Sequence, residues 1–237
     1  MIGTFINVAT IVIGSLLGIM IGARFSSNLR ETVVSGLGLF TLAYGLMTFL
    51  ETSNPLVPLG GLLIGALLGE WWKLEEHLQN VGQFLRRLVV RGDSSQETQS
   101  RFVEGFVTAS LVFVIGPMAI LGAIQDGMTG NFEMLTIKAI LDGFASIAFA
   151  SSLGIGVIFS AGSILIYQGG ISLLSGIFSQ YFSATMVTEM TAAGGLILIA
   201  ISLSSLLAVK KIRTGSFLPG LLITPLIMFI LERFFGG

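Results

Sequence analysis

Charged residues are so rare in this 237-residue chain that they divide it into long apolar runs. Only 11% of the residues are charged, less than half of the roughly 25% that is usual in soluble domains. A soluble protein of this length needs more charge to cover its surface. The chain is therefore predicted to fold as one integral membrane domain over 1–237, an all-α bundle of transmembrane helices with the lipid bilayer as its main partner.

Eight segments of the chain are predicted to cross the membrane, mostly as apolar helices of about 20 residues. They cover residues 2–23, 33–50, 57–69, 102–124, 135–160, 162–182, 187–209 and 218–231. The alternative is seven spans plus a re-entrant hairpin at 162–182, which is rich in serine and glycine. The polar stretch 91–101 is predicted as a cytoplasmic loop. It separates a first helical unit, 1–90, which ends in an amphipathic extension, from a second unit, 102–237.

The basic residues predict how the spans are oriented, because cytoplasmic loops are enriched in Lys and Arg. These residues gather at 24–30, 73–101 and 210–213, whereas the turns near 51, 131 and 183 hold none apart from Lys138, just inside the fifth span. If the three basic groups are cytoplasmic, both termini lie outside and residues 162–182 cross the membrane. Residues 12–15 are similar in sequence to residues 114–117, and residues 35–37 to residues 142–144. These short similarities also suggest inverted three-helix repeats.

Glycines recur at every fourth residue in two of the spans, which places them on one side of each helix. Such stripes let another backbone approach closely, so helix packing is their main predicted role. A homodimer seam and a smooth pore-lining face are the alternatives. The stripes consist of Gly14, Gly18 and Gly22 in the first span and Gly61, Gly65 and Gly69 in the third.

Acidic residues are costly inside a membrane, so their positions are candidates for function. Asp142 lies clearly within a span, whereas Asp126 and Glu189 lie at span ends. The predicted topology brings all three near the outer side, where we expect them to converge and to attract a cation or relay protons. Capping of a helix end is an equal alternative for Asp126 and Glu189. Lys138 is placed to pair with Asp142, four residues later on the same helix.

The pair Gly116-Pro117 interrupts the fourth span, where proline removes a backbone hydrogen bond. Broken helices in transporters offer such freed backbone groups to ions and substrates, and a plain kink is the alternative. Asn7 supplies an amide at the matching place in the first span. Gly116, Pro117, Asn7 and Ser146 therefore join the three carboxylates in the predicted substrate or ion site.

Signatures of enzymes are absent from the sequence, which contains no GxSxG, HExxH or phosphate-binding loop. With no Cys and one His, the chain is not predicted to hold a Cys/His metal centre. A net charge of −1 likewise gives no basic face for nucleic acid. We expect no catalytic residues, no cofactor, no metal and no nucleic-acid partner.

Three runs of the chain resemble a known family. They are residues 116–127 (GPMAILGAIQDG), Asp142-Gly-Phe-x-Ser146 and Glu189-x4-Gly194-Gly195, and they look like the bacterial multi-pass family called domain of unknown function 554. The resemblance covers essentially the whole chain. It implies a protein of the bacterial cytoplasmic (inner) membrane with a suspected transport role, and it supplies no binding residues.

The function predicted from these observations is transport of a small solute or ion, by a channel or a carrier, through an acidic site between the fourth and fifth spans. Because the sequence encodes no nucleotide-binding motif, an ion gradient or diffusion would drive the flux. The alternative is a non-transporting membrane scaffold or subunit that packs through the glycine stripes. A homo-oligomer is a further expectation for such stripes.

Overall fold

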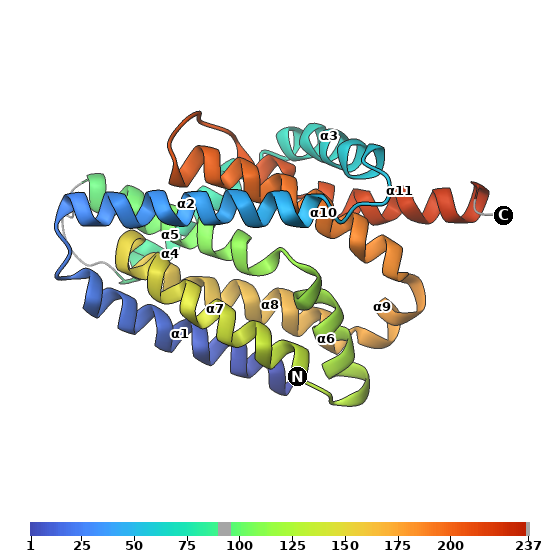
Figure 1. Ribbon diagram of the computed structural model, residues 1–237, viewed down its shortest axis with the longest axis horizontal. Helices are drawn as coiled ribbons and strands as arrows, with labels where there is room; N and C mark the ends of the chain where they lie inside the picture. The colour runs from blue at the N-terminus through green and yellow to red at the C-terminus, as the bar shows by residue number, and fades with distance from the viewer. Residues whose placement is uncertain (90–95, 236–237) are drawn as a thin grey trace.

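The computed structural model describes residues 1–89 and 96–235, and this part of the chain contains helices and no strand. Figure 1 shows α1 (Ile2–Gly22), α2 (Ser27–Phe49) and α7 (Glu133–Leu153) running roughly along the long axis of the molecule. The predicted all-α membrane bundle is confirmed. The remaining α-helices are α3 (Leu56–Trp71), α4 (Leu74–Val89), α5 (Gln96–Val114), α6 (Pro117–Thr129), α8 (Ser160–Leu173), α9 (Ser175–Tyr181), α10 (Ala184–Ile201) and α11 (Gly220–Phe235).

The membrane spans can be counted from the length and composition of the described helices. Six helical segments are long and apolar enough to cross a bilayer, and the bent pair α5–α6 counts as a seventh. The remaining apolar helix, α3, has 16 residues. At a rise of 1.5 Å per residue it reaches about 24 Å, somewhat less than the roughly 30 Å of a hydrocarbon core. Eight crossings, as predicted, therefore require α3 to cross as a short span.

The boundary between the fifth and sixth spans differs from the predicted one. The sequence predicts a fifth span to residue 160, whereas α7 ends at Leu153 and the next apolar segment, Ile155–Leu173, begins two residues later. Gly154 makes this turn with a φ of 84°, which glycine adopts without steric cost. The end of the predicted sixth span forms the separate helix α9 (Ser175–Tyr181).

The predicted loop at 91–101 is described only in part. Residues 91–95 lie outside the described residues. Residues 96–101 belong to the first turns of α5, which begins at Gln96. The helical part of the second unit therefore starts earlier than the sequence pattern indicates, because these polar residues form the beginning of α5 in place of a loop.

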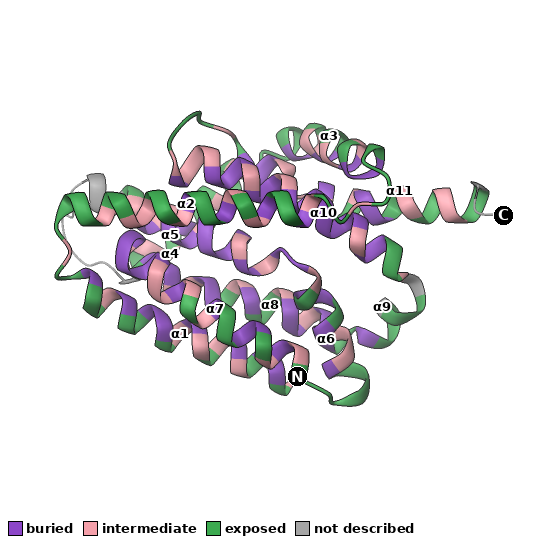
Figure 2. Cartoon of the chain, in the orientation of Figure 1, coloured by how far each residue is buried: buried purple, intermediate pink, exposed green. Residues whose placement is uncertain are grey.

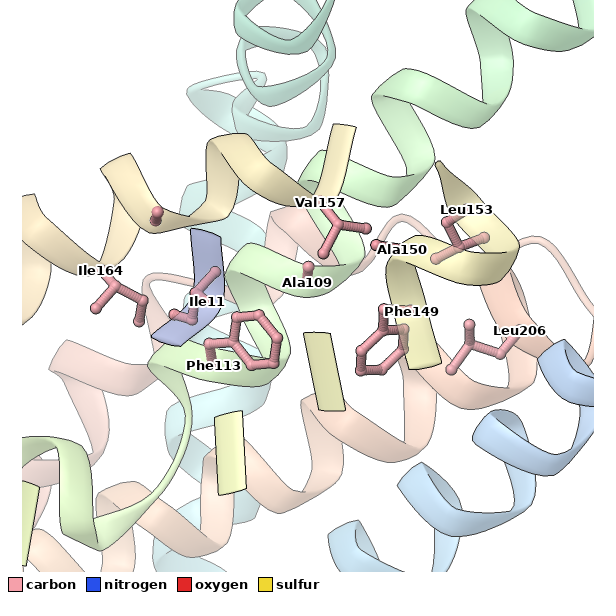
Figure 3. Packing of buried hydrophobic residues seen from close by; sticks show 10 residues of the cluster. Ile11, Ala109, Phe113, Phe149, Ala150, Leu153, Val157, Ile164 and Leu206 are labelled. Atoms are coloured by element: carbon pink, nitrogen blue, oxygen red, sulfur yellow. The ribbon is translucent and has the colours of Figure 1, made fainter. Parts of the chain in front are cut away.

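The distribution of buried side chains is that of a bundle surrounded by lipid. Figure 2 shows buried residues on the inward sides of the helices and exposed residues on their outer sides. Large apolar side chains lie on the outside as well, such as Phe144 and Ile166, which are 71% and 80% exposed. The inner core joins α1, α5, α7 and α8 through Ile11, Phe113 and Ile164 among others (Figure 3).

Glycines bring three helix pairs into backbone contact. A Cβ atom on Gly18 of α1 would lie 2.3 Å from the carbonyl oxygen of Ile147 in α7, too close for any real contact. A Cβ atom on Gly65 of α3 would lie 2.3 Å from the backbone nitrogen of Gly220 in α11. The third pair, Gly45 of α2 and Gly195 of α10, was not predicted from the sequence. A Cβ atom on Gly45 would lie 2.7 Å from the Gly195 carbonyl oxygen, and one on Gly195 would lie 2.6 Å from the Gly45 carbonyl oxygen. The structure thus sets both glycine stripes against other helices of the same chain.

This packing predicts that Gly18→Ala destabilises the fold by about 1–3 kcal/mol, because the added methyl group forces α1 away from α7. Gly36→Ala in α2 is the matched control, since nothing lies within 4 Å of a Cβ atom there. The measurement is thermal unfolding of the purified protein in detergent. Equal melting temperatures for the two variants would contradict the close packing of α1 on α7.

Candidate functional site

The break between α5 and α6 follows from the chemistry of one proline. Pro117 has no backbone N–H, so it cannot bond the carbonyl of Phe113, four residues earlier. Helix α5 accordingly ends at Val114, and α6 restarts with Pro117 in its first turn, at an angle of 65°. Gly116 links the two helices with a φ of 142°, a conformation that L side chains rarely adopt.

Lys138 of α7 takes the place of the missing backbone donor. Its ammonium nitrogen donates to the Phe113 carbonyl oxygen at 2.8 Å, the very group that Pro117 leaves without an intrahelical partner. The lysine is only 6% exposed. A charged side chain from a neighbouring helix therefore satisfies the backbone at the helix break.

Asp142 balances the charge of Lys138 from the next turn of α7. The two side chains form a buried ion pair, and Asn7 of α1 donates its amide to the same carboxylate at 3.0 Å. The Asn7 amide also donates to the Gln168 side-chain oxygen of α8 at 3.2 Å. The Asn7 side chain must therefore point its amide nitrogen, and not its amide oxygen, at Asp142, because an ionised carboxylate only accepts hydrogen bonds. We call Lys138, Asp142, Asn7 and Gln168 the Lys138 network.

The Lys138 network joins α1, α7 and α8, and the Phe113 carbonyl connects it to α5, at a point where a lone charge is costly. A single charged side chain at the centre of a bilayer costs several kcal/mol, and pairing with an opposite charge lowers that cost. Both amides of the network are fully buried, and Asp142 is 8% exposed. The network is therefore a neutral but strongly polar element inside an apolar bundle.

A groove of about 310 Å³ opens beside this network, between α2, the helix break and α7. Its walls are mainly apolar, and Lys138 and Asp142 are the charged residues that line it. Phe40 and Phe144 in its walls are 67% and 71% exposed, so the groove reaches the outer surface of the bundle. Its other wall residues include Leu37, Thr41, Tyr44, Phe113, Ile115, Gly116, Met118, Leu141 and Phe149.

The other two candidate acids have partners of their own. The Asp126 carboxylate accepts from the backbone nitrogen of Gly3 at 3.1 Å and pairs with the Met1 amine at 3.0 Å, so it holds the start of α1. The Glu189 carboxylate accepts from the backbone nitrogen of Ser53 at 2.8 Å and from the Thr52 hydroxyl, so it holds the α2–α3 turn. The three carboxylates that the sequence predicts to converge thus bind three separate sets of partners.

The structure brings together some of the predicted site residues and separates others. Asn7 contacts Asp142 directly, and Gly116 lines the groove with it. Ser146 instead donates to the Gly143 carbonyl of its own helix at 2.7 Å. Its oxygen lies where a Cβ atom on Gly14 would fall, so it belongs to the contact between α1 and α7.

Two members of the site were underrated by sequence reasoning. Lys138 was considered only as a partner of Asp142, and the Phe113 carbonyl was not considered. The Phe113 carbonyl could have been identified from the sequence, because a proline leaves the carbonyl four residues before it without a backbone hydrogen-bond partner. Nothing in the sequence indicates that Lys138 of another helix reaches that carbonyl. Among the described residues, no group of three or more His, Asp or Glu side chains is arranged to hold a metal ion.

Together, the apolar spans, the broken helix and the buried ion pair define a polytopic helical membrane protein with a polar site inside its bundle. The chain belongs to the family described as protein of unknown function (DUF554), whose sequence profile matches residues 2–229. This agrees with the resemblance of the three motif runs.

Two relatives are similar to the chain over nearly their whole length. The uncharacterized membrane protein YdfK of Bacillus subtilis (strain 168) is 28% identical over 239 residues, which cover 99% of this chain and 98% of YdfK. The uncharacterized protein YqgA of Escherichia coli (strain K12) is 29% identical over 222 residues, which cover 94% of each chain. No solved structure matches the chain. The description of YdfK as a membrane protein agrees with the membrane fold of this chain.

The geometry of the ion pair predicts a strong energetic coupling between Lys138 and Asp142. Lys138→Met alone leaves Asp142 as an unpaired buried charge, which costs about 3–5 kcal/mol. The double variant Lys138→Met with Asp142→Asn removes both charges, so its loss should be clearly smaller than the sum of the two single losses. Unfolding of all four proteins in detergent measures the difference. Additive losses would contradict a charge pair at this place.

Proposed function

We propose that this membrane protein transports a small solute or ion, and that the Lys138–Asp142 pair at the helix break is its site. The observation that carries the proposal is the ion pair itself, buried in the bundle and facing a groove of about 310 Å³. An ionisable residue inside a membrane protein is a candidate for a transport or proton pathway on physical grounds. Asp142 is the proposed electrostatic ligand. Lys138 carries the positive charge with which the transported species competes for Asp142.

The helix break supports the proposal because it supplies a polar group that can change partners. A broken helix at membrane depth is stable only where protein or a water-filled cavity satisfies its backbone. Here one lysine holds both the Phe113 carbonyl and Asp142. A cation or proton that reaches Asp142 weakens the ion pair and leaves Lys138 on the carbonyl alone. A lysine with two alternative arrangements is a two-state element whose equilibrium a bound ion can shift.

The glycine stripes favour transport over the alternative of a scaffold. A scaffold that packs through these stripes needs them on a free surface. Gly14 and Gly61 instead lie against side chains of α7 and α11, at 2.2 Å and 2.0 Å from where their Cβ atoms would be. A protein partner would have to use another surface of the bundle.

The proposal predicts that Asp142→Asn reduces flux at least about tenfold, because the neutral amide removes the charge that the transported species must bind. The protein is reconstituted into liposomes, and H⁺, Na⁺, K⁺ and ammonium are tested as probes with fluorescent reporters of pH and membrane potential. Glu133→Gln is the matched control, since Glu133 is an exposed acid at the start of the same helix. Flux that is equal in Asp142→Asn and in wild type removes Asp142 from the site.

We further propose that the protein resides in a bacterial cytoplasmic membrane with both termini outside. The basic turn around Arg24 and Arg30 lies at the end of α1 opposite to Met1, as Figure 1 shows for the α1–α2 connection. A phosphatase fused to the C-terminus, active only outside, should therefore be active. A green fluorescent protein fusion at the same place should stay dark when exported unfolded. The reverse pattern contradicts this orientation.

A further inference from the structure

The contact between α1 and α8 contains polar side-chain atoms that have no partner. They are the hydroxyl groups of Thr4 and Ser172, the side-chain oxygen of Asn7 and the side-chain nitrogen of Gln168. All four residues are at most 3% exposed. Thr4 precedes Asn7 by one turn on α1, and Ser172 follows Gln168 by one turn on α8, so each pair lies on one side of its helix. Asn7 and Gln168 are hydrogen-bonded to each other, which joins the two pairs. We call them the α1–α8 seam.

The seam begins where Asp126 holds the start of α1. Gly127, the residue after Asp126, lies so close to α8 that a Cβ atom on it would be 2.1 Å from the Ser172 carbonyl oxygen. A Cβ atom on Gly169 of α8 would lie 3.3 Å from Met1 and 3.8 Å from Thr4. Met1 is partly exposed, with 31% of its side chain accessible. One end of the seam is therefore near the surface of the bundle.

The other end of the seam is the Lys138 network. Asn7 and Gln168 belong to both, and Asn7 donates to Asp142 at 3.0 Å. A buried polar atom without a partner costs about as much as a lost hydrogen bond, and lipid cannot supply one. Water is the small ligand that both donates and accepts, so it can satisfy a hydroxyl, an amide oxygen and an amide nitrogen alike.

We infer that the α1–α8 seam binds a file of water molecules that carries protons between the Met1 end of the bundle and Asp142. The inference rests on the proposed transport function and names the proton as its coupling ion. In the step at the site, an excess proton arrives along the file as hydronium and passes to the Asp142 carboxylate, which becomes a neutral carboxyl group and leaves a neutral water molecule behind. Lys138 keeps its charge and its bond to the Phe113 carbonyl, and the ion pair is lost. The groups charged or titratable around this point are Lys138, Tyr44 of α2 across the groove, and Asp126 with the Met1 amine at the far end.

The test uses variants that keep the shape of the seam and remove its polar atoms. Thr4→Val and Ser172→Ala are the test variants, and they are combined in a double variant. Ser160→Ala is the matched control, since Ser160 is a fully buried serine of the same helix whose hydroxyl donates to the Val157 carbonyl at 2.7 Å. Proton uptake is measured in liposomes with a pH-sensitive dye, driven by a potassium diffusion potential.

We expect the double variant to lose proton flux by about tenfold or more, because an interrupted water file raises the barrier to transfer. The control should keep wild-type flux. If the seam variants conduct protons like wild type while Asp142→Asn does not, the proton path through the seam is overturned and the proposed site stands. If wild type moves only Na⁺, K⁺ or ammonium, the proton path through the seam is again overturned and the transport function stands. If no probe moves through wild type, both fail.

A second measurement covers the case in which the double variant does not fold. The infrared carboxyl band of Asp142, identified by its loss in Asp142→Asn, is followed in acidified samples after transfer to deuterated water. Ser172→Ala alone should slow the exchange of this band relative to Ser160→Ala. Equal rates of hydrogen–deuterium exchange at Asp142 in these two folded variants overturn the proton path through the seam, whatever proton flux the double variant shows.

Discussion

The bond between Lys138 and the Phe113 carbonyl is the interaction on which the interior of this bundle depends. Pro117 ends α5 and leaves that carbonyl without its backbone partner. In lipid such a group has to be satisfied by the protein itself. Lys138 does so at 2.8 Å, and its charge in turn requires Asp142. One proline thus determines why a lysine and an aspartate are buried here.

The glycine stripe of α1 makes the rest of the network possible. Asn7, Ile11, Gly14 and Gly18 are all buried on one side of α1. Because Gly14 and Gly18 have no side chains, that side approaches the backbone of α7 directly. The approach brings Asn7 within 3.0 Å of Asp142, and Asn7 then reaches Gln168 of α8. Close packing and the polar site are therefore two results of the same helix contact.

The sequence was informative wherever one residue type has a strong local effect. The scarcity of charge predicts the membrane fold, Pro117 predicts the helix break, and the position of Asp142 inside a span identifies the central acid. The turn at Gly154 was missed because no charge or proline marks it, and only a backbone φ of 84° reveals it. The partners of Glu189 and Asp126 could not be predicted either, because they come from the α2–α3 turn and from the start of α1, each more than 100 residues away in the chain.

The most direct measurement for the central claim is a solid-state NMR distance in lipid bilayers between the Lys138 side-chain nitrogen, labelled with ¹⁵N, and the Phe113 carbonyl, labelled with ¹³C. The bond between Lys138 and the Phe113 carbonyl predicts a measurable dipolar coupling between the two nuclei, because a nitrogen–oxygen distance of 2.8 Å places the carbonyl carbon at most about 4 Å from the nitrogen. It also predicts that Asp142→Leu changes the chemical shift of that nitrogen. Absence of the coupling in a protein whose α5–α6 break is intact would contradict the account.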